Sequence, residues 1–69
     1  MATQYFWDRG YAYNDIGGDE CISVTLWQGE YFLAEWQYST FLSEGLAERR
    51  AARRIRNLTS TYGATPRPR

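Results

Sequence analysis

Histidine and lysine are absent from this 69-residue chain, and cysteine occurs once, at Cys21. A single cysteine excludes a framework of disulfides within the chain, and the missing histidine excludes the usual Cys/His zinc site. The same shortages remove the nucleophile–base pairs on which many hydrolases depend. We therefore expect a non-enzymatic protein that holds no metal and no other cofactor.

Long apolar stretches are missing as well. No run approaches the roughly 20 residues that span a bilayer, and the N-terminal residues lack the charged start and apolar centre of a secretory signal. These features predict a soluble, cytoplasmic protein without a membrane partner.

Aromatic residues, in contrast, make up 17% of the chain. Each buries a large area, so they can supply the core of one small domain. We expect that domain to span residues 1–62. The remaining residues, 63–69, are rich in proline and arginine and predict a disordered tail.

The clearest local pattern is a β-hairpin from Cys21 to Tyr38, because apolar and polar residues alternate on both sides of Gly29. A three-residue connection, Gln28 to Glu30, gathers the aliphatic residues on one face. It predicts the pairs Leu26–Phe32, Val24–Ala34 and Ile22–Trp36. A two-residue turn would instead place Glu35 and Gln37 among the apolar residues.

The hairpin is flanked by a strand and a helix. Residues 4–13 are predicted to form a first strand. A helix is predicted to begin near residue 41 or 44 and to end near Leu58, and its candidate N-caps are Ser39, Thr40 and Ser43. Its apolar stripe is expected at Phe41, Ala52, Ile55 and Tyr62, flanked by Ala51 and Leu58. The predicted fold is α+β, with a three-stranded antiparallel meander packed against one long C-terminal helix.

One helix covers one face of such a sheet. We expect that face to carry Ile22, Val24, Leu26, Phe32, Ala34, Trp36 and Phe6. The second face then carries Leu33 and three larger aromatic residues that could anchor a partner: Trp7, Trp27 and Tyr31.

Charge is distributed unevenly along the chain. Residues 1–48 hold all eight acids and the single base Arg9, a net charge of −7, whereas residues 49–69 hold seven arginines and no acid. Such asymmetry indicates partners of opposite charge or contact between the two halves.

The acidic half leads to our first functional prediction, a non-enzymatic protein that binds a larger basic, nucleic-acid-handling protein by imitating nucleic acid. The aromatic anchors named above would support the contact, and these are the acidic residues predicted to make it: Asp15, Asp19, Glu20, Glu30 and Glu35. Small size, acidity and missing catalytic residues resemble the general profile of phage-encoded inhibitors, including anti-CRISPR proteins. That resemblance implies an inhibitor acting in the host cytoplasm.

Two alternatives remain open. In one, the protein is a small nucleic-acid-binding or regulatory module that uses its arginine-rich helix: Arg49, Arg50, Arg53, Arg54 and Arg56. In the other, the chain is a homodimer in which the acidic half of one copy meets the arginine helix of the second.

Overall fold

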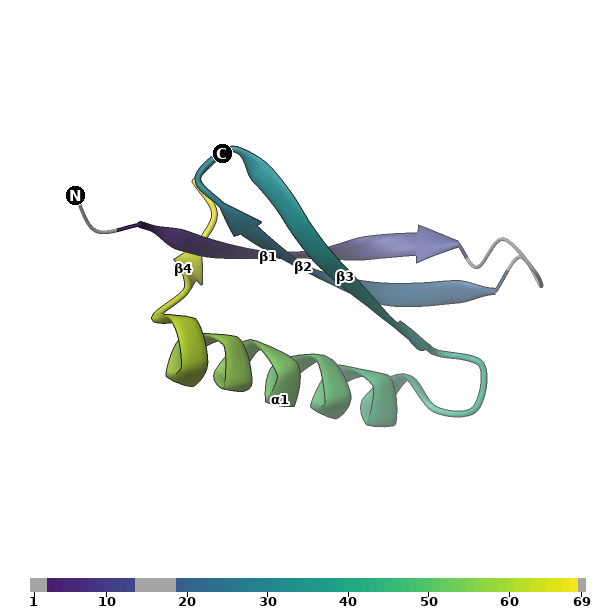
Figure 1. Ribbon diagram of the computed structural model, residues 1–69. Helices are drawn as coiled ribbons and strands as arrows, with labels where there is room; N and C mark the ends of the chain where they lie inside the picture. Colours follow the sequence, from purple (N-terminus) through teal and green to yellow (C-terminus); the bar gives the residue numbers. More distant parts are fainter. Residues whose placement is uncertain (1–2, 14–18, 69) are drawn as a thin grey trace.

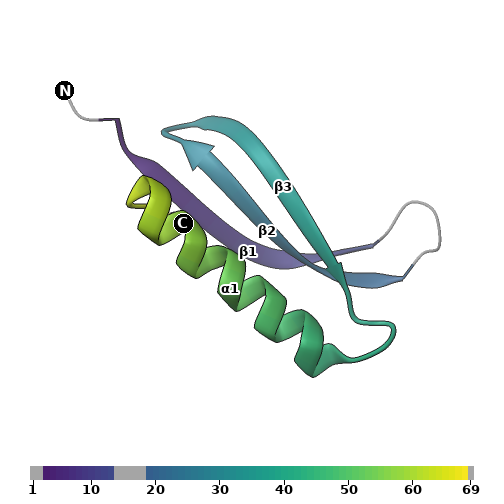
Figure 2. The ribbon, with the colours of Figure 1, turned by 60° about the horizontal axis from the view of Figure 1, so that its bottom comes forward.

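The computed structural model describes residues 3–13 and 19–68. Within these ranges the elements are, in chain order, β1 (Tyr5–Tyr13), β2 (Glu20–Gln28), β3 (Tyr31–Ser39), α1 (Glu44–Tyr62) and β4 (Thr65–Pro66). The strands form a sheet in the spatial order β3-β2-β1-β4, and α1 lies along one face of it (Figures 1 and 2). The α+β class is confirmed, but the sheet formed by these residues is mixed and has four strands instead of three.

The fourth strand lies in the segment that the sequence predicted to be a disordered tail. Gly63 ends α1 in the left-handed conformation, with φ of 66°, and the chain then returns towards β1. Thr65–Pro66 pairs in parallel with β1, and the Arg67 N–H donates to the Trp7 carbonyl oxygen at 2.8 Å. A proline is tolerated here because β4 is an edge strand. Ala64 is buried, so this segment packs against the domain.

Strands β2 and β3 form the predicted hairpin, but with a different register. The turn has two residues, and its first residue, Gly29, takes the positive φ (59°) that such a turn favours. The observed pairs are Leu26–Ala34, Val24–Trp36 and Ile22–Tyr38, which corrects the predicted pairing.

A β-bulge explains why the shorter turn still keeps the apolar residues together. Leu26 pairs with Ala34 and Trp27 pairs with Phe32, so the register skips Leu33. One extra residue reverses the alternation of side chains along the strand. The bulge therefore offsets the effect of the two-residue turn, and Glu35 stays off the face that α1 covers.

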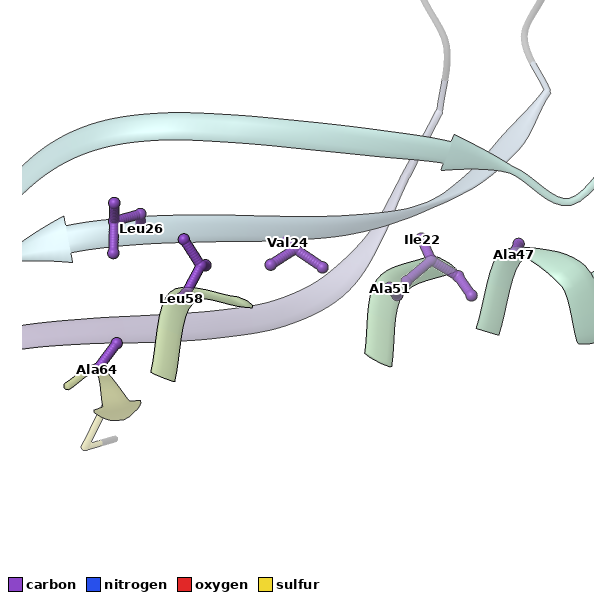
Figure 3. Packing of buried hydrophobic residues seen from close by; sticks show 7 residues of the cluster. All are labelled: Ile22, Val24, Leu26, Ala47, Ala51, Leu58 and Ala64. Carbon is purple, nitrogen blue, oxygen red and sulfur yellow. The ribbon is translucent and has the colours of Figure 1, made fainter. Parts of the chain in front are cut away.

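The core lies between β2 and α1. Its buried apolar residues are Ile22, Val24, Leu26, Ala47, Ala51, Leu58 and Ala64. In Figure 3 the β2 side chains extend towards the helix, where two alanines leave room for a close approach. This packing fixes which side of α1 faces the sheet and which side faces solvent.

Helix α1 begins where one candidate cap predicted, since the Ser43 hydroxyl accepts the Leu46 N–H at 3.1 Å. It continues past Leu58 to Tyr62, four residues further than expected. The predicted apolar stripe was partly wrong, because Ala52 is exposed and Phe41 precedes the helix. Among the described residues, no helix is long and apolar enough to cross a membrane.

Four aromatic residues lie on the opposite face from the one predicted: Phe6, Trp7, Tyr31 and Phe32. The β1–β2 register places Trp7 beside Leu26, so Trp7 packs against the core. The same register places Phe6 beside Trp27 on the face away from α1, which we call the open face. Phe32 lies there too, with its ring centroid 5.5 Å from that of Trp27. The cause is the register of β1 for Phe6 and Trp7, and the two-residue turn for Tyr31 and Phe32, because the bulge comes after both residues and restores the predicted face only from Ala34 onwards.

Candidate functional site

Four of the five carboxylates that were predicted to bind a partner lie within the described residues, and the structure disperses them: Asp19, Glu20, Glu30 and Glu35. Asp15 lies outside the described residues. Asp19 and Glu20 lie at the start of β2, whereas Glu30 lies in the turn beyond its end, ~26 Å or more away along the strand. Glu35 is exposed on the open face, where it accepts a 2.6 Å hydrogen bond from the Ser23 hydroxyl. These four described acids do not line one common site.

The three predicted aromatic anchors do not share a surface either. Trp7 packs against the core, as described above. Trp27 is half-buried on the open face, where its indole N–H donates to the Thr25 hydroxyl at 2.9 Å. The Arg67 guanidinium lies 3.6 Å from the centroid of the Trp27 ring, a cation–π contact that partly covers it. Tyr31 is 77% exposed and pairs with the residue after Trp27, which places it on the other side of the sheet.

The arginines of α1 behave differently, because three of the five gather around one concave site. Arg50, Arg53 and Arg54 line a pocket of about 280 Å³ between α1 and β3, together with Tyr38 and Asn57. We call this the arginine pocket. The other two predicted residues, Arg49 and Arg56, are exposed on the same helix but do not line the pocket.

Helical spacing brings the pocket residues together. Positions 50, 53, 54 and 57 are three or four residues apart, so they lie on one side of α1. The core contacts of Ala47, Ala51 and Leu58 fix the rotation of the helix and turn that side towards β3. Tyr38 reaches the same site from β3, where it pairs with Ile22 on the face that α1 covers.

Arg54 is held in place by two neighbours on β3. Its Nε–H donates to the Tyr38 hydroxyl at 3.0 Å, and its guanidinium lies 4.5 Å from the centroid of the Trp36 ring. Neither neighbour is acidic, so the positive charge of Arg54 is oriented without being neutralised. Its remaining guanidinium N–H groups can serve a ligand in the pocket.

Among the described residues, no acid lines the pocket to balance its positive charge. Across residues 3–13 and 19–68, none of Arg50, Arg53 and Arg54 forms an ion pair with a carboxylate. The acid nearest to them in the sequence, Glu48, pairs instead with Arg9 of β1. Like charges three and four residues apart on a helix repel one another. The pocket is therefore a concave, positively charged site that an anion would stabilise.

Sequence reasoning missed Tyr38 and Asn57 as members of this site. The signal for Tyr38 was its position two residues after Trp36, on the same face of the strand. The signal for Asn57 was its spacing of four and three residues from Arg53 and Arg54. Neither signal was decisive without the register of β3.

The remaining candidates among the described residues are clusters of metal-ligating side chains and the single cysteine. Within residues 3–13 and 19–68, no group of three or more His, Cys, Asp or Glu side chains is arranged to hold a metal ion. Cys21 is buried, and its thiol lies 3.6 Å from the Asp19 carbonyl oxygen, at the edge of β2. We therefore take the arginine pocket as the candidate functional site, and the chemistry it supports is the recognition of an anion.

Comparison with protein-family models, curated proteins and solved structures found no match for this chain. The geometry of α1 and β3 is therefore the basis for inferring a function.

Proposed function

We propose that the protein is a non-enzymatic nucleic-acid-binding module and that the arginine pocket receives a backbone phosphate. The observation that carries this proposal is that three arginines line one concave site and that none of its described lining residues is acidic. This is the function that the sequence offered as its first alternative.

Phosphate suits the pocket because of the shape of the arginine side chain. A guanidinium group is planar and presents several N–H donors, which match the oxygens of a phosphate in paired hydrogen bonds. Arg54 is already oriented by Tyr38 and Trp36, so less freedom is lost when the ligand binds. A bound phosphate would also relieve the repulsion among the three neighbouring arginines.

A polymer suits the surface better than a single phosphate ion does. Arg49 and Arg56 are exposed on the same helix and extend the positive charge beyond the pocket. A nucleic acid offers further phosphates to such a surface, and each contact releases counterions. The carboxylate of Glu35 lies on the open face, and Glu48 pairs with Arg9, so neither occupies this side of α1.

The proposal is tested by fluorescence anisotropy with short labelled single-stranded and duplex oligonucleotides at low and moderate salt. We expect salt-sensitive binding that weakens about tenfold or more in the double variant Arg50→Ala/Arg53→Ala. The matched control is Arg49→Ala/Arg56→Ala, which removes the same charge outside the pocket and should have a smaller effect. Absence of binding at low salt, or equal effects of the two variants, would contradict the proposal.

A second proposal retains the acidic surface as a docking site for a basic, nucleic-acid-handling protein that this protein would inhibit. The observation in its favour is the exposure of Glu20, Glu30 and Glu35. Substitution of all three by alanine should then abolish capture of such a protein, while the Arg50→Ala/Arg53→Ala variant keeps it. If the chain is instead a homodimer that joins unlike charges, sedimentation should reveal a dimer that dissociates as salt is raised.

A further inference from the structure

A second pocket adjoins the arginine pocket where β3 leads into α1. It has a volume of about 250 Å³ and is lined by Asp19, Ser39, Phe41, Leu42, Ser43, Leu46 and Arg50. We call it the Phe41 pocket. Arg50 lines both pockets, so the two sites share a wall. The connection between β3 and α1, which contributes Phe41, Leu42 and Ser43, is visible in Figure 2.

Two apolar side chains of the Phe41 pocket are unusually open to solvent. Phe41 is 76% exposed and Leu42 is 87% exposed, next to each other in the chain. The backbone around them is held by hydrogen bonds: the Phe41 N–H donates to the Ser39 hydroxyl at 3.2 Å, and the Ser43 hydroxyl caps α1. The fold thus holds two apolar groups in solvent beside a cluster of arginines.

The arginine pocket and the Phe41 pocket lie side by side, so together they suit a ligand that carries a flat apolar group close to a phosphate. A nucleobase meets that description, since it can stack on the Phe41 ring while its polar edge remains available. Asp19 lines the same pocket, and its carboxylate is a group that can accept a hydrogen bond from an exocyclic amine of the base. The shared residue Arg50 is placed to contact the linking phosphate.

We infer that the two pockets together bind single-stranded nucleic acid, with a phosphate in the arginine pocket and an unpaired base in the Phe41 pocket. This inference rests on the proposed function and adds the form of nucleic acid that is preferred. In a duplex the bases are stacked inside the helix, so no base is available to contact Phe41 and Leu42. In a single strand the bases are free to turn out and stack on an aromatic side chain.

An anionic membrane surface is the competing occupant, since it too combines phosphate with apolar groups. The lining of the Phe41 pocket argues against it. Insertion into a membrane would bring the Asp19 carboxylate towards anionic headgroups and hydrocarbon, which is unfavourable. The apolar side chains also line a concave site, which encloses a small flat group better than it penetrates a lipid layer.

The test compares three ligands of equal length and label: a single-stranded oligonucleotide, the same strand with abasic sites throughout, and the matching duplex. We expect the normal single strand to bind about tenfold more tightly than the abasic strand, because stacking of a base is lost while the phosphates remain. The duplex should also bind more weakly than the normal single strand at equal phosphate concentration.

The variant Phe41→Ala/Leu42→Ala should remove most of the preference and leave the affinity for the abasic strand unchanged. Its matched control is Tyr31→Ala/Leu33→Ala, which removes an exposed aromatic and an exposed leucine elsewhere on the sheet. Circular dichroism and thermal unfolding of both variants should match the original protein, because the substituted side chains are exposed.

The outcomes separate this inference from the proposed function. Equal affinity for all three ligands, with Arg50→Ala/Arg53→Ala still weakening each, would overturn the inference and leave the proposed function standing. Absence of binding to every ligand would overturn both. Binding to vesicles of anionic phospholipid that is lost in Phe41→Ala/Leu42→Ala, without any preference among oligonucleotides, would also overturn the inference in favour of a lipid surface.

Discussion

The two sides of α1 use charge in different ways. On the side next to β1, Arg9 and Glu48 form an ion pair, and the Tyr5 ring packs against Tyr62 with centroids 5.1 Å apart. On the side next to β3, three arginines line the arginine pocket, and no carboxylate from the described part of the chain does. The contacts on the β1 side therefore hold α1 against the sheet, whereas the arginines on the β3 side remain available to bind an anionic ligand.

The difference shows that residue type alone does not assign a role to an arginine. Arg9 is neutralised by its neighbour, whereas Arg54 is oriented by two uncharged aromatic residues and keeps its charge. Both are fixed by the tertiary structure, and only the chemistry of the neighbour differs. The net charge of zero for the whole chain conceals this contrast.

The largest expected effect comes from breaking the core contact that both sides of α1 share. Leu58 is almost fully buried in that contact. Leu58→Ala should lower the free energy of unfolding by ~2–5 kcal/mol, because it leaves a cavity where α1 meets the sheet. In a domain of this size that loss is a large part of the total stability. Urea denaturation followed by circular dichroism measures it.

The control for this change is Ala52→Ser on the exposed surface of the same helix, which should alter stability by less than ~0.5 kcal/mol. An unchanged unfolding midpoint for Leu58→Ala would contradict the packing of α1 on the sheet. The positions of the Arg9–Glu48 ion pair and of the arginine pocket would then no longer be explained by the packing of α1.

The next effect concerns the β3 side alone. Reversing two pocket charges in Arg50→Glu/Arg53→Glu should reduce the affinity for a single-stranded oligonucleotide by a factor on the order of 100 at low salt, since attraction to phosphate becomes repulsion. Fluorescence anisotropy measures the loss.

The matched variant Arg49→Glu/Arg56→Glu has the same net charge but leaves the pocket lining intact. Its effect should be on the order of tenfold and should fade near physiological salt, where the Debye length is about 8 Å. If the two variants lose affinity equally at every salt concentration, the pocket has no special role and only overall charge matters.

Much of the fold was predictable from local patterns. The alternation from Cys21 to Tyr38 predicted a hairpin, and the polar cap at Ser43 predicted the start of the helix. Both patterns depend on neighbours close in sequence. The β3 register was not predictable in this way, because a two-residue turn and a bulge at Leu33 together give the same alternation as a longer turn.

The candidate site was harder to predict for the same reason. The acidic residues are numerous, but a site depends on which side chains the tertiary structure brings together. The helical spacing of Arg50, Arg53 and Arg54 was visible in the sequence, whereas their contact with Tyr38 requires the strand register. The face of Trp7 likewise depends on the pairing of β1 with β2, which a single strand does not encode.

A smaller effect should follow from Tyr38→Phe, which removes the hydroxyl that orients Arg54 and keeps the ring. We expect a loss of ~0.5–1.5 kcal/mol in stability, the usual contribution of one hydrogen bond, and a severalfold loss of oligonucleotide affinity. Thermal unfolding and anisotropy measure the two. Tyr31→Phe is the control, since that residue is exposed and does not line the pocket. A loss of stability with unchanged affinity would mean that Arg54 need not be held in place to bind phosphate.

The smallest effect is expected on the β1 side. Glu48→Gln keeps the shape of the side chain but removes one charge of the ion pair with Arg9. Both side chains are partly open to solvent, at 35% exposed for Arg9 and 43% for Glu48, so the pair should contribute no more than ~1 kcal/mol. Thermal unfolding at low and at 1 M salt measures this, and the difference should vanish at high salt because exposed charges are screened. Oligonucleotide affinity should rise slightly or stay the same. A loss of affinity in Glu48→Gln would show that the ion pair positions the arginine pocket, and the two sides of α1 would then act as one.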